Sequence, residues 1–418
     1  MTRPTLLLVV AGAAMLCGTF VPVAAASASA GSIEASTNIA LSGLSAALAD
    51  PFVVQAEISG NGLKYFGAGE HGVALSADGN TALITEWEET GQADVFTRSG
   101  STWSLQARLP QPSGITGRIG HSVALAADGN TALLTSWNGK AWTYTRSGST
   151  WTFQSELAPR EGEGVRPPRA FAYSTALSSD GNTAILGAVS ANASGVASGA
   201  AWVFTRSGST WSEETVLNPA DQTVYPQGEG ASPDAVALSA DGGVALLGNP
   251  ADGESTGGAW IYERTAAGWV EHGSKLTGQG ETGLGEFGSS VALSGDGSTA
   301  LIGGPYDAYG GGGAWAFARG EGGWKPQGDE LIPKLEPVSG GFGESLALSA
   351  NGATALIGGG YNGPEREGAA WVFRRSGEHW WQEQKLADPV PHPEAGMGGS
   401  VALSGDATTA LVSAPSDP

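Results

Sequence analysis

Residues 287–305 read FGSSVALSGDGSTALIGGP and residues 313–324 read GAWAFARGEGGW, and this pair of segments returns along almost the whole chain. The turn aspartate of the first segment, or Asn351 in the sixth copy, recurs at intervals of 50, 52, 61, 55, 55 and 55 residues. Repeats of that length are typical of β-propeller blades and are longer than most helical repeats. The core, Val-Ala-Leu-Ser-x-Asp-Gly-x-Thr-Ala-Leu-Ile-Gly, has seven copies: Val73–Thr85, Val123–Thr135, Thr175–Gly187, Val236–Gly248, Val291–Gly303, Leu346–Gly358 and Val401–Ser413.

Each copy has the pattern of β-strands. Val-Ala-Leu-Ser is a short apolar run, Asp-Gly supplies the positive φ angles of a tight hairpin turn, and Thr-Ala-Leu-Ile-Gly runs back. In six copies a third strand such as Ala201–Arg206 follows, then a second turn and a fourth strand that opens on a tryptophan. Large groups on one face and methyl groups on the other suit sheets stacked in a ring. We therefore predict an all-β fold, a seven-bladed β-propeller of four-stranded antiparallel blades.

The last copy contains only its first two strands before the chain ends at Pro418. A fourth strand is present near the N-terminus, because Phe52–Ile58 matches Trp103–Leu109 in its spacing of an aromatic residue, a glutamine and an aliphatic residue. Residues 40–48 are a degenerate candidate for the third strand. We predict that this N-terminal segment closes the last blade and removes two open sheet edges. The alternative is a shortened gene product whose last blade is incomplete.

The first residues are predicted to direct export. Residues 1–30 have a charged start, the apolar run Leu6–Leu16 and a small-residue cleavage site at Ala28–Ala30, which is the pattern of a secretory signal peptide. The run is too short for a typical transmembrane span. The only cysteine, Cys17, lies inside this segment after a leucine, a context that disfavours lipidation. We expect a secreted, extracellular or cell-surface-associated protein with no transmembrane span after signal cleavage, although an uncleaved signal could anchor it.

The rest of the chain divides into two parts. Residues 31–50 form an Ala/Ser-rich lead-in that contains the degenerate strand, and residues 51–418 hold the repeats. The chain has 41 acidic and 20 basic residues, a formal charge of −21, which argues against binding to nucleic acid or to anionic membranes. The glycine run 310–313 precedes neither a helix nor a Lys-Ser or Lys-Thr pair, so it is no phosphate-binding loop. We expect no cofactor and a monomeric protein.

The repeat resembles a known family. Phe-Gly at residues 287–288 and 342–343, with Gly303-Gly304-Pro305 after the second strand, is similar to the FG-GAP repeat, and the extension through the tryptophan strands looks like its bacterial secreted branch. The resemblance covers roughly residues 50–418. It implies a propeller like that of integrin α-subunits, with adhesion and ligand recognition outside the cell. The integrin calcium loops are not matched, because a turn with Asp296 as its one carboxylate cannot supply six to eight oxygen ligands.

Two tryptophans break the repeat pattern and define a candidate site. Trp87 and Trp137 both follow the second strand of their copies, and His71 and His121 lie two residues before the first strand's valine, where the third copy has Tyr173. The start of the first strand and the end of the second share one end of a hairpin, so these residues should share one face. Exposed aromatic rings beside carboxylates suit stacking on sugars or gripping a protein loop; the nearby acids are Glu86, Glu88 and Glu89.

The alternative is that each off-pattern tryptophan merely covers the end of a blade. Two histidines could also hold a metal, but a third ligand would have to converge, and we assign no metal site. Residues that recur in every copy are more simply structural: the turn aspartates, the arginines before the second turn and most tryptophans. A catalytic set would need unevenly placed acids, and nothing in the sequence brings them together; the candidates are Glu161, Glu163, Asp234 and Glu254.

Three functions remain open from the sequence. The first is a non-enzymatic propeller that binds an extracellular glycan or a surface protein, with the candidate ligand-binding residues His71, Trp87, His121, Trp137 and Tyr173. The second is a propeller-based glycan hydrolase or lyase, for which no catalytic residues are assigned. The third is a purely structural repeat domain. Release of a bound glycan intact or cleaved would discriminate the first from the second.

Overall fold

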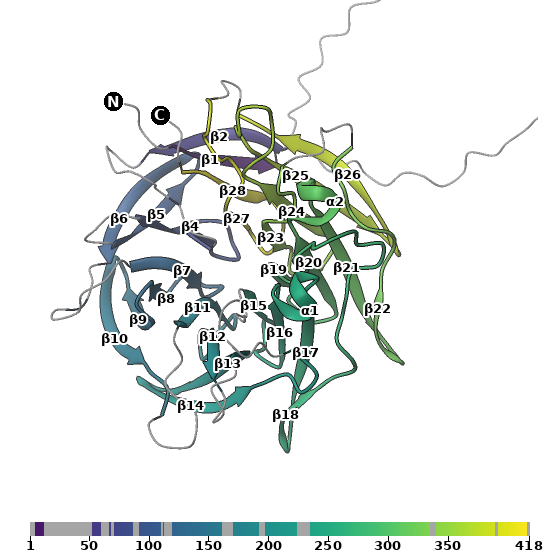
Figure 1. Ribbon diagram of the computed structural model, residues 1–418. Helices are drawn as coiled ribbons and strands as arrows, with labels where there is room; N and C mark the ends of the chain where they lie inside the picture. Colours follow the sequence, from purple (N-terminus) through teal and green to yellow (C-terminus); the bar gives the residue numbers. More distant parts are fainter. Residues whose placement is uncertain are drawn as a thin grey trace, which may run out of the picture.

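The computed structural model describes twelve stretches of the chain, and within them the protein is a β-propeller. They are residues 5–11, 52–59, 67, 71–86, 92–109, 112, 119–160, 170–191, 197–223, 235–334, 340–388 and 392–415. Four-stranded antiparallel sheets stand around a central axis, with the first strand of each blade innermost and the fourth outermost (Figure 1). The innermost strands contact one another in a closed ring.

Six blades consist of four consecutive strands each, which we number 1 to 6 along the chain. Blades 1 to 3 comprise β3 (Val73–Leu75), β4 (Thr81–Glu86), β5 (Gln92–Ser99) and β6 (Thr102–Leu109); β7 (Ile119–Leu125), β8 (Thr131–Ser136), β9 (Lys140–Ser147) and β10 (Thr150–Leu157); and β11 (Ala170–Leu177), β12 (Thr183–Ala191), β13 (Ala197–Ser207) and β14 (Thr210–Leu217).

Blades 4 to 6 differ from the first three mainly in the connection after their second strand, where blades 4 and 5 carry the four-residue elements α1 (Asp252–Ser255) and α2 (Asp307–Gly310). Their strands are β15 (Ala235–Leu238), β16 (Val244–Asn249), β17 (Gly258–Thr265) and β18 (Gly268–Glu271); β19 (Ser290–Leu293), β20 (Thr299–Gly304), β21 (Gly313–Gly320) and β22 (Gly323–Pro326); and β23 (Ser345–Leu348), β24 (Thr354–Gly359), β25 (Ala369–Ser376) and β26 (His379–Leu386).

The predicted Asp-Gly hairpin turn is present and its aspartate is structural. In blade 5 the Ser294 hydroxyl donates to Asp296 at 2.6 Å and accepts from the Thr299 amide at 2.9 Å. Gly297 has φ +65°, and a Cβ there would lie 2.8 Å from Val244 of blade 4. Glycine is therefore required both by the turn conformation and by the close approach of the next blade.

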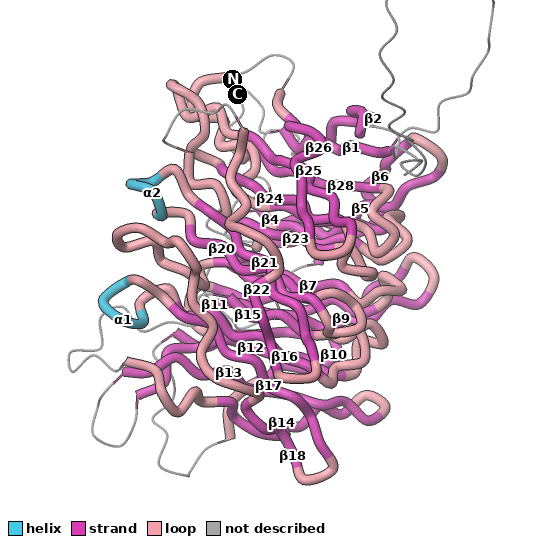
Figure 2. Tube along the Cα trace, turned by 90° about the vertical axis from the view of Figure 1, so that its right-hand side faces the viewer, coloured by secondary structure: helices cyan, strands magenta, loops and turns pink. Residues whose placement is uncertain are grey.

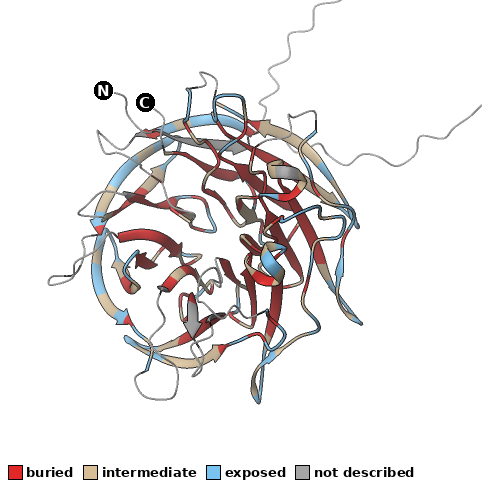
Figure 3. Ribbon diagram, viewed as in Figure 1, coloured by how far each residue is buried: buried red, intermediate tan, exposed pale blue. Residues whose placement is uncertain are grey.

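The core lies between the blades rather than inside any one of them. Trp315 and Phe317 of blade 5, for example, pack in one buried cluster with Ile261 of blade 4. Figure 3 shows the inner and middle strands buried, while the outermost strands are largely intermediate or exposed. Small residues on one face of each sheet let the neighbouring sheet approach, which explains the methyl-rich face seen in the sequence.

The recurring arginines and tryptophans join neighbouring blades. Arg146 lies 5.4 Å from the ring of Trp151 in its own blade 2, and both donate to the side-chain oxygen of Gln106 in blade 1, at 3.2 and 3.1 Å. Blades 2 and 3 repeat this contact through Gln154, and blades 5 and 6 through Gln327. These arginines therefore form hydrogen bonds between neighbouring blades, in addition to carrying charge at the ends of their strands.

The prediction of seven equivalent blades, with the last closed by the N-terminal segment of residues 40–48 and Phe52–Ile58, is wrong as stated. Six blades have four consecutive strands, and the remaining sheet is a composite in the order β2 (Phe52–Ser59), β1 (Thr5–Ala11), β28 (Thr409–Ala414) and β27 (Val401–Leu403). Its third strand is Thr5–Ala11 rather than residues 40–48, which lie outside the described residues. An apolar run of seven residues fits a buried strand as well as a signal core, so periodicity alone could not separate the two.

Candidate functional site

One end of the propeller carries the starts of the first strands and the connections between second and third strands. The elements α1 and α2 project from this end (Figure 2). We call it the loop face. Side chains in the first residues of β7 and β11, just before β19 and β23, and just after β8, β20 and β24 lie at this end because the blades share one strand order.

The aromatic cluster predicted from the sequence forms on the loop face of blades 2 and 3. The ring centroid of His121 lies 4.8 Å from that of Trp137 and 4.2 Å from that of Tyr173, both with edge-on geometry. His71 of blade 1 joins it through its carbonyl, which accepts from the Val123 amide at 3.0 Å. Trp87 lies outside the described residues, as do Glu88 and Glu89. The structure therefore brings four of the five predicted residues together.

Local strand irregularities position this cluster. The pairing of β7 with β8 shifts register between Ile119 and Val123, and that of β11 with β12 shifts between Phe171 and Thr175. Such bulges redirect side chains away from the regular ladder. As a result His121 is buried at the centre of the cluster, while Trp137 is 61% exposed and presents its ring to solvent.

Burial makes the histidine of the cluster neutral. The pKa of His121 is lowered to about 4, first because burial disfavours the charged imidazolium and second because His71 lies nearby. A neutral ring packed edge-on against two aromatic rings gives this part of the loop face an uncharged, rigid surface. It can cover the apolar face of a ligand, but it offers no charge at neutral pH.

A pocket that the sequence reasoning missed lies on the loop face between blades 5 and 6. Its volume is about 550 Å³, and its lining includes Tyr306, Tyr361, Glu286, Glu344 and Arg366. Tyr306 and Tyr361 are 55% and 53% exposed, so large parts of their rings are open to a ligand. The remaining lining is rich in glycine, which lets a ligand approach the backbone closely.

Charged groups surround the two tyrosines. The Arg366 guanidinium lies 5.6 Å from the centroid of the Tyr361 ring. The Glu344 carboxylate accepts from the Gly360 amide at 2.9 Å, and burial raises the pKa of Glu286. The pocket thus combines two aromatic rings with hydrogen-bond donors and acceptors of both charges. A signal was present in the sequence, since Tyr306 and Tyr361 are one repeat apart and each lies two residues after a Gly-Gly pair at the end of the second strand.

Of the four acids considered for catalysis, only Glu254 lies in the described part of the chain. Glu254 lies in α1 and does not line the tyrosine pocket. Glu161, Glu163 and Asp234 are outside the described residues. Among the residues with described positions, no three His, Cys, Asp or Glu side chains form a group that could hold a metal ion. No helix within the described ranges is long and apolar enough to cross a membrane.

Comparisons with known proteins support the fold and nothing finer. No protein-family model matches the chain, and no curated protein matches it in sequence. It is similar in structure to hydrazine synthase of Kuenenia stuttgartiensis, with a TM-score of 0.54 and 13% identity over 84% of this chain and 94% of that one. It is also similar to the Cps50 (Swd1) β-propeller domain of Myceliophteria thermophila, with a TM-score of 0.52 and 12% identity over 82% and 97%.

These similarities place the chain in the class of β-propellers. At 12–13% identity they show the fold alone, and neither comparison supports the FG-GAP family specifically. The function therefore has to be argued from the loop face.

Proposed function

We propose that this protein is a secreted, non-enzymatic propeller that binds a carbohydrate through its loop face. The observation that carries the proposal is the pocket of about 550 Å³ with the half-exposed rings of Tyr306 and Tyr361. Sugar rings stack their apolar faces on such aromatic rings. Their hydroxyls would hydrogen-bond to the Glu286 and Glu344 carboxylates and to Arg366, which line the same pocket.

The cluster of His121, Trp137 and Tyr173 extends this surface to the other side of the loop face. Because His121 is neutral and Trp137 is exposed, the cluster suits an uncharged ligand better than an ionic one. Export is supported by the signal-like pattern of residues 1–30, whereas the pairing of Thr5–Ala11 as β1 of the composite sheet requires that this segment stay in the mature chain. Recognition outside the cell is supported by the resemblance to FG-GAP repeats. The FG-GAP relationship is itself part of the proposal.

The test is binding of the labelled full-length protein to an array of immobilised glycans. Tyr306→Ala combined with Tyr361→Ala should abolish binding and leave the melting temperature nearly unchanged, because both rings are more than half exposed. The matched control is Trp381→Ala, which removes a partly exposed tryptophan from the outermost strand β26 of blade 6. Trp137→Ala tests separately whether the aromatic cluster contacts the same glycan.

Three results would contradict the proposal in different ways. Binding that survives loss of both tyrosines would place the glycan elsewhere. Binding to a surface protein but to no glycan would replace the carbohydrate by a protein loop. Release of a shortened glycan from the bound complex would establish a hydrolase or lyase in place of a non-enzymatic binder.

A further inference from the structure

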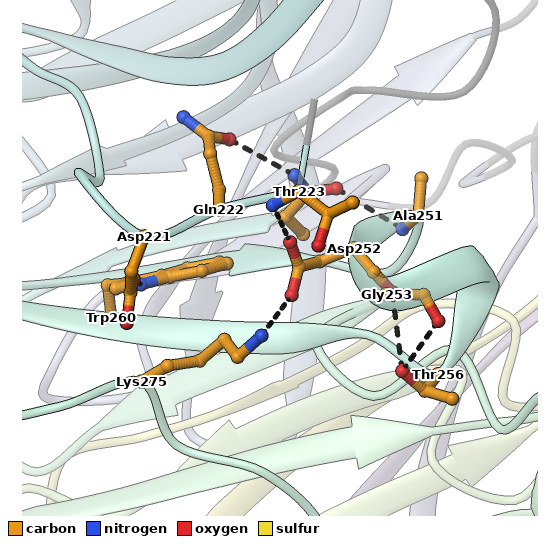
Figure 4. A network of polar contacts seen from close by, with 10 residues as sticks. Asp221, Gln222, Thr223, Ala251, Asp252, Gly253, Thr256, Trp260 and Lys275 are labelled. Carbon is orange, nitrogen blue, oxygen red and sulfur yellow. Dashed lines mark hydrogen bonds and ion pairs between the residues drawn. The ribbon is translucent and has the colours of Figure 1, made fainter. Parts of the chain in front are cut away.

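Blade 4 holds an internal ammonium site, drawn in Figure 4. The Lys275 ammonium donates to the Asp252 carboxylate at 2.6 Å and lies 6.0 Å from the centroid of the Trp260 ring. The other Asp252 oxygen accepts from the Thr223 amide at 2.5 Å. Asp252 is fully buried, so the lysine neutralises a carboxylate that would otherwise be costly to bury. The indole N–H of Trp260 donates to Asp221 at 2.5 Å.

Blade 6 repeats the arrangement with different residues. The Lys385 ammonium donates to the Asn362 side-chain oxygen at 3.2 Å and lies 5.4 Å from the centroid of the Trp371 ring. Two blades of the same chain therefore place a lysine ammonium over the tryptophan of the third strand. This position is an ammonium site wherever the chain supplies a lysine.

Blade 5 has the same framework but lacks the lysine. Asp307 begins α2 as Asp252 begins α1, and its carboxylate accepts from the Thr282 amide at 2.5 Å, just as Asp252 accepts from Thr223. In blade 5, Leu331 pairs with Ala314, and the residue before Leu331 is Glu330. In blade 4 the matching pair is Leu276 with Ala259, and the residue before Leu276 is Lys275. The basic residue of blade 4 is thus an acidic residue in blade 5.

Because Glu330 replaces the lysine, the carboxyl groups of Glu281, Asp307 and Glu330 lie close to one another. Asp307 is buried, and the Oε1 atoms of Glu281 and Glu330 are buried without a hydrogen-bond partner among the described residues. Burial, the hydrogen bond with Asp307 and repulsion from Asp307 and Glu281 raise the pKa of Glu330 to about 8. Burial and repulsion from Asp307 raise the pKa of Glu281 to about 7.

Blade 5 also has room where blade 4 is filled. The residue matching Asp221 is Gly280, whose missing Cβ would have no atom within 4 Å. Trp315 turns its indole N–H to the Gln279 carbonyl at 3.0 Å instead. A pocket of about 360 Å³ results, lined by Trp315, Glu330, Gly280 and Asp329 among others. It opens beside Trp315, which is equivalent to the tryptophans that carry a lysine in blades 4 and 6.

We propose that this pocket of blade 5 binds a primary ammonium group from outside the chain, held beside Trp315 by the carboxylate of Glu330, which is itself hydrogen-bonded to Asp307. The ligand would supply to Trp315 the ammonium group that Lys275 and Lys385 supply to the tryptophans of blades 4 and 6. An ammonium has three donors and is attracted to the face of an indole ring. A metal ion fits less well, because these acids do not form a group that could hold one within the described part of the chain. The net charge of −21 would draw such a cation to the protein.

The proposal does not depend on glycan binding, since the tyrosine pocket shares none of its lining residues with this one. A lysine side chain of a peptide and a free alkyl diamine carry the same chemistry. The probes are therefore N-acetyl-lysine methylamide and 1,5-diaminopentane, with N-acetyl-norleucine methylamide as the uncharged control. Preference for the first probe would indicate a protein ligand, and preference for the second a free polyamine.

Binding to the full-length protein is measured by isothermal titration calorimetry at pH 8.5 and at pH 6. Both ammonium probes should bind and the norleucine control should not. Binding should be weaker at pH 6, where Glu281 and Glu330 are protonated. Glu330→Lys should weaken binding by at least about tenfold, because its own ammonium would fill the site as in blade 4. Glu330→Gln should weaken it as well, and Glu321→Gln, in an exposed turn of the same blade, should not.

The proposal also predicts that Glu330→Lys raises the melting temperature at pH 8, because it rebuilds the neutral arrangement of blade 4. Equal binding of the norleucine control, unchanged binding in Glu330→Lys, or no binding of either amine at pH 8.5 would overturn it. The three acids would then be a cluster that shares protons and has no ligand.

Discussion

Acidification should destabilise the protein through one residue, His121. Its imidazole is buried between Trp137 and Tyr173, and its pKa is lowered from 6.5 to about 4 by burial and by the nearby His71. The unfolded chain therefore takes up a proton at this residue as the pH falls through 6.5, whereas the folded chain does so only near pH 4. The stability that the neutral ring provides is complete above pH 6.5 and is lost progressively as the pH falls toward 4.

The size of the effect follows from the two pKa values. At pH 5 the unfolded imidazole is almost fully protonated, while the folded one carries about a tenth of a proton. Because one pKa unit corresponds to about 1.4 kcal/mol, the loss between pH 7.5 and pH 5 is about 2 kcal/mol from His121 alone. Other groups titrate in the same interval, and Glu281 and Glu330 act in the opposite direction because the pKa of each is raised. A comparison between variants is needed to isolate the histidine.

The variant is His121→Phe, which keeps a planar ring and removes the titration. Urea unfolding of the wild type and of the variant is measured at pH 7.5 and at pH 5. The wild type should lose about 2 kcal/mol more than the variant over this interval, since all other titrating groups are common to both. In parallel, the NMR resonance that disappears in His121→Phe should titrate in the wild type with a midpoint near pH 4.

Two results would refute this reasoning. If the two proteins lost the same stability between pH 7.5 and pH 5, the folded state would not exclude the proton from His121. A midpoint near 6.5 for the assigned resonance would show that water reaches the imidazole. The aromatic cluster would then be open and mobile rather than a preformed surface.

Three further predictions concern the scaffold. Phe342→Ala should cost about 3–5 kcal/mol in urea unfolding, because its ring is buried in a cluster that joins Leu301 and Ala314 of blade 5 to Trp371 of blade 6; a cost below about 1 kcal/mol would contradict interblade packing there. Gln106→Ala should cost about 1–3 kcal/mol because it removes the acceptor of the Trp151 indole N–H and one of the acceptors of Arg146, whereas Gln106→Glu should retain an acceptor and lose less. Removal of residues 1–30 deletes β1, which pairs with β2 and β28, so the melting temperature should fall; an unchanged melt would mean that another segment replaces it.

Most of the fold could be predicted because the decisive information is local and repeated. Asp296-Gly297 determines a hairpin through its own side chain and a positive φ, and the same turn returns in every copy. The composite sheet could not be predicted in this way. Its third strand, Thr5–Ala11, has no turn motif of its own and pairs with residues at the far end of the chain. Strand partners so distant in sequence depend on ring closure, which no local pattern encodes.

The candidate site was predictable only in part, for a similar reason. That His121 and Trp137 meet follows from hairpin geometry, because the start of one strand and the end of the next share an end, and Tyr173 joins them from the equivalent position in the neighbouring blade. The tyrosine pocket depends on how blades 5 and 6 stand relative to each other, with side chains from both. The regular spacing of Tyr306 and Tyr361 could have revealed their shared face, but not that a cavity separates them.

Blades 4, 5 and 6 carry different residues next to the third-strand tryptophan, so the fold does not require one particular charge at that position. Blades 4 and 6 show that the position over the third-strand tryptophan accepts a lysine, which is paired with the Asp252 carboxylate in blade 4 and hydrogen-bonded to Asn362 in blade 6. Blade 5 places Glu330 there beside two other carboxylates, although the raised pKa values of Glu281 and Glu330 mean that ionising them inside the folded protein is unfavourable. Since the same scaffold folds with lysine one blade away on either side, folding does not require the acidic set. A cation supplied from outside would remove the repulsion that the chain leaves uncompensated.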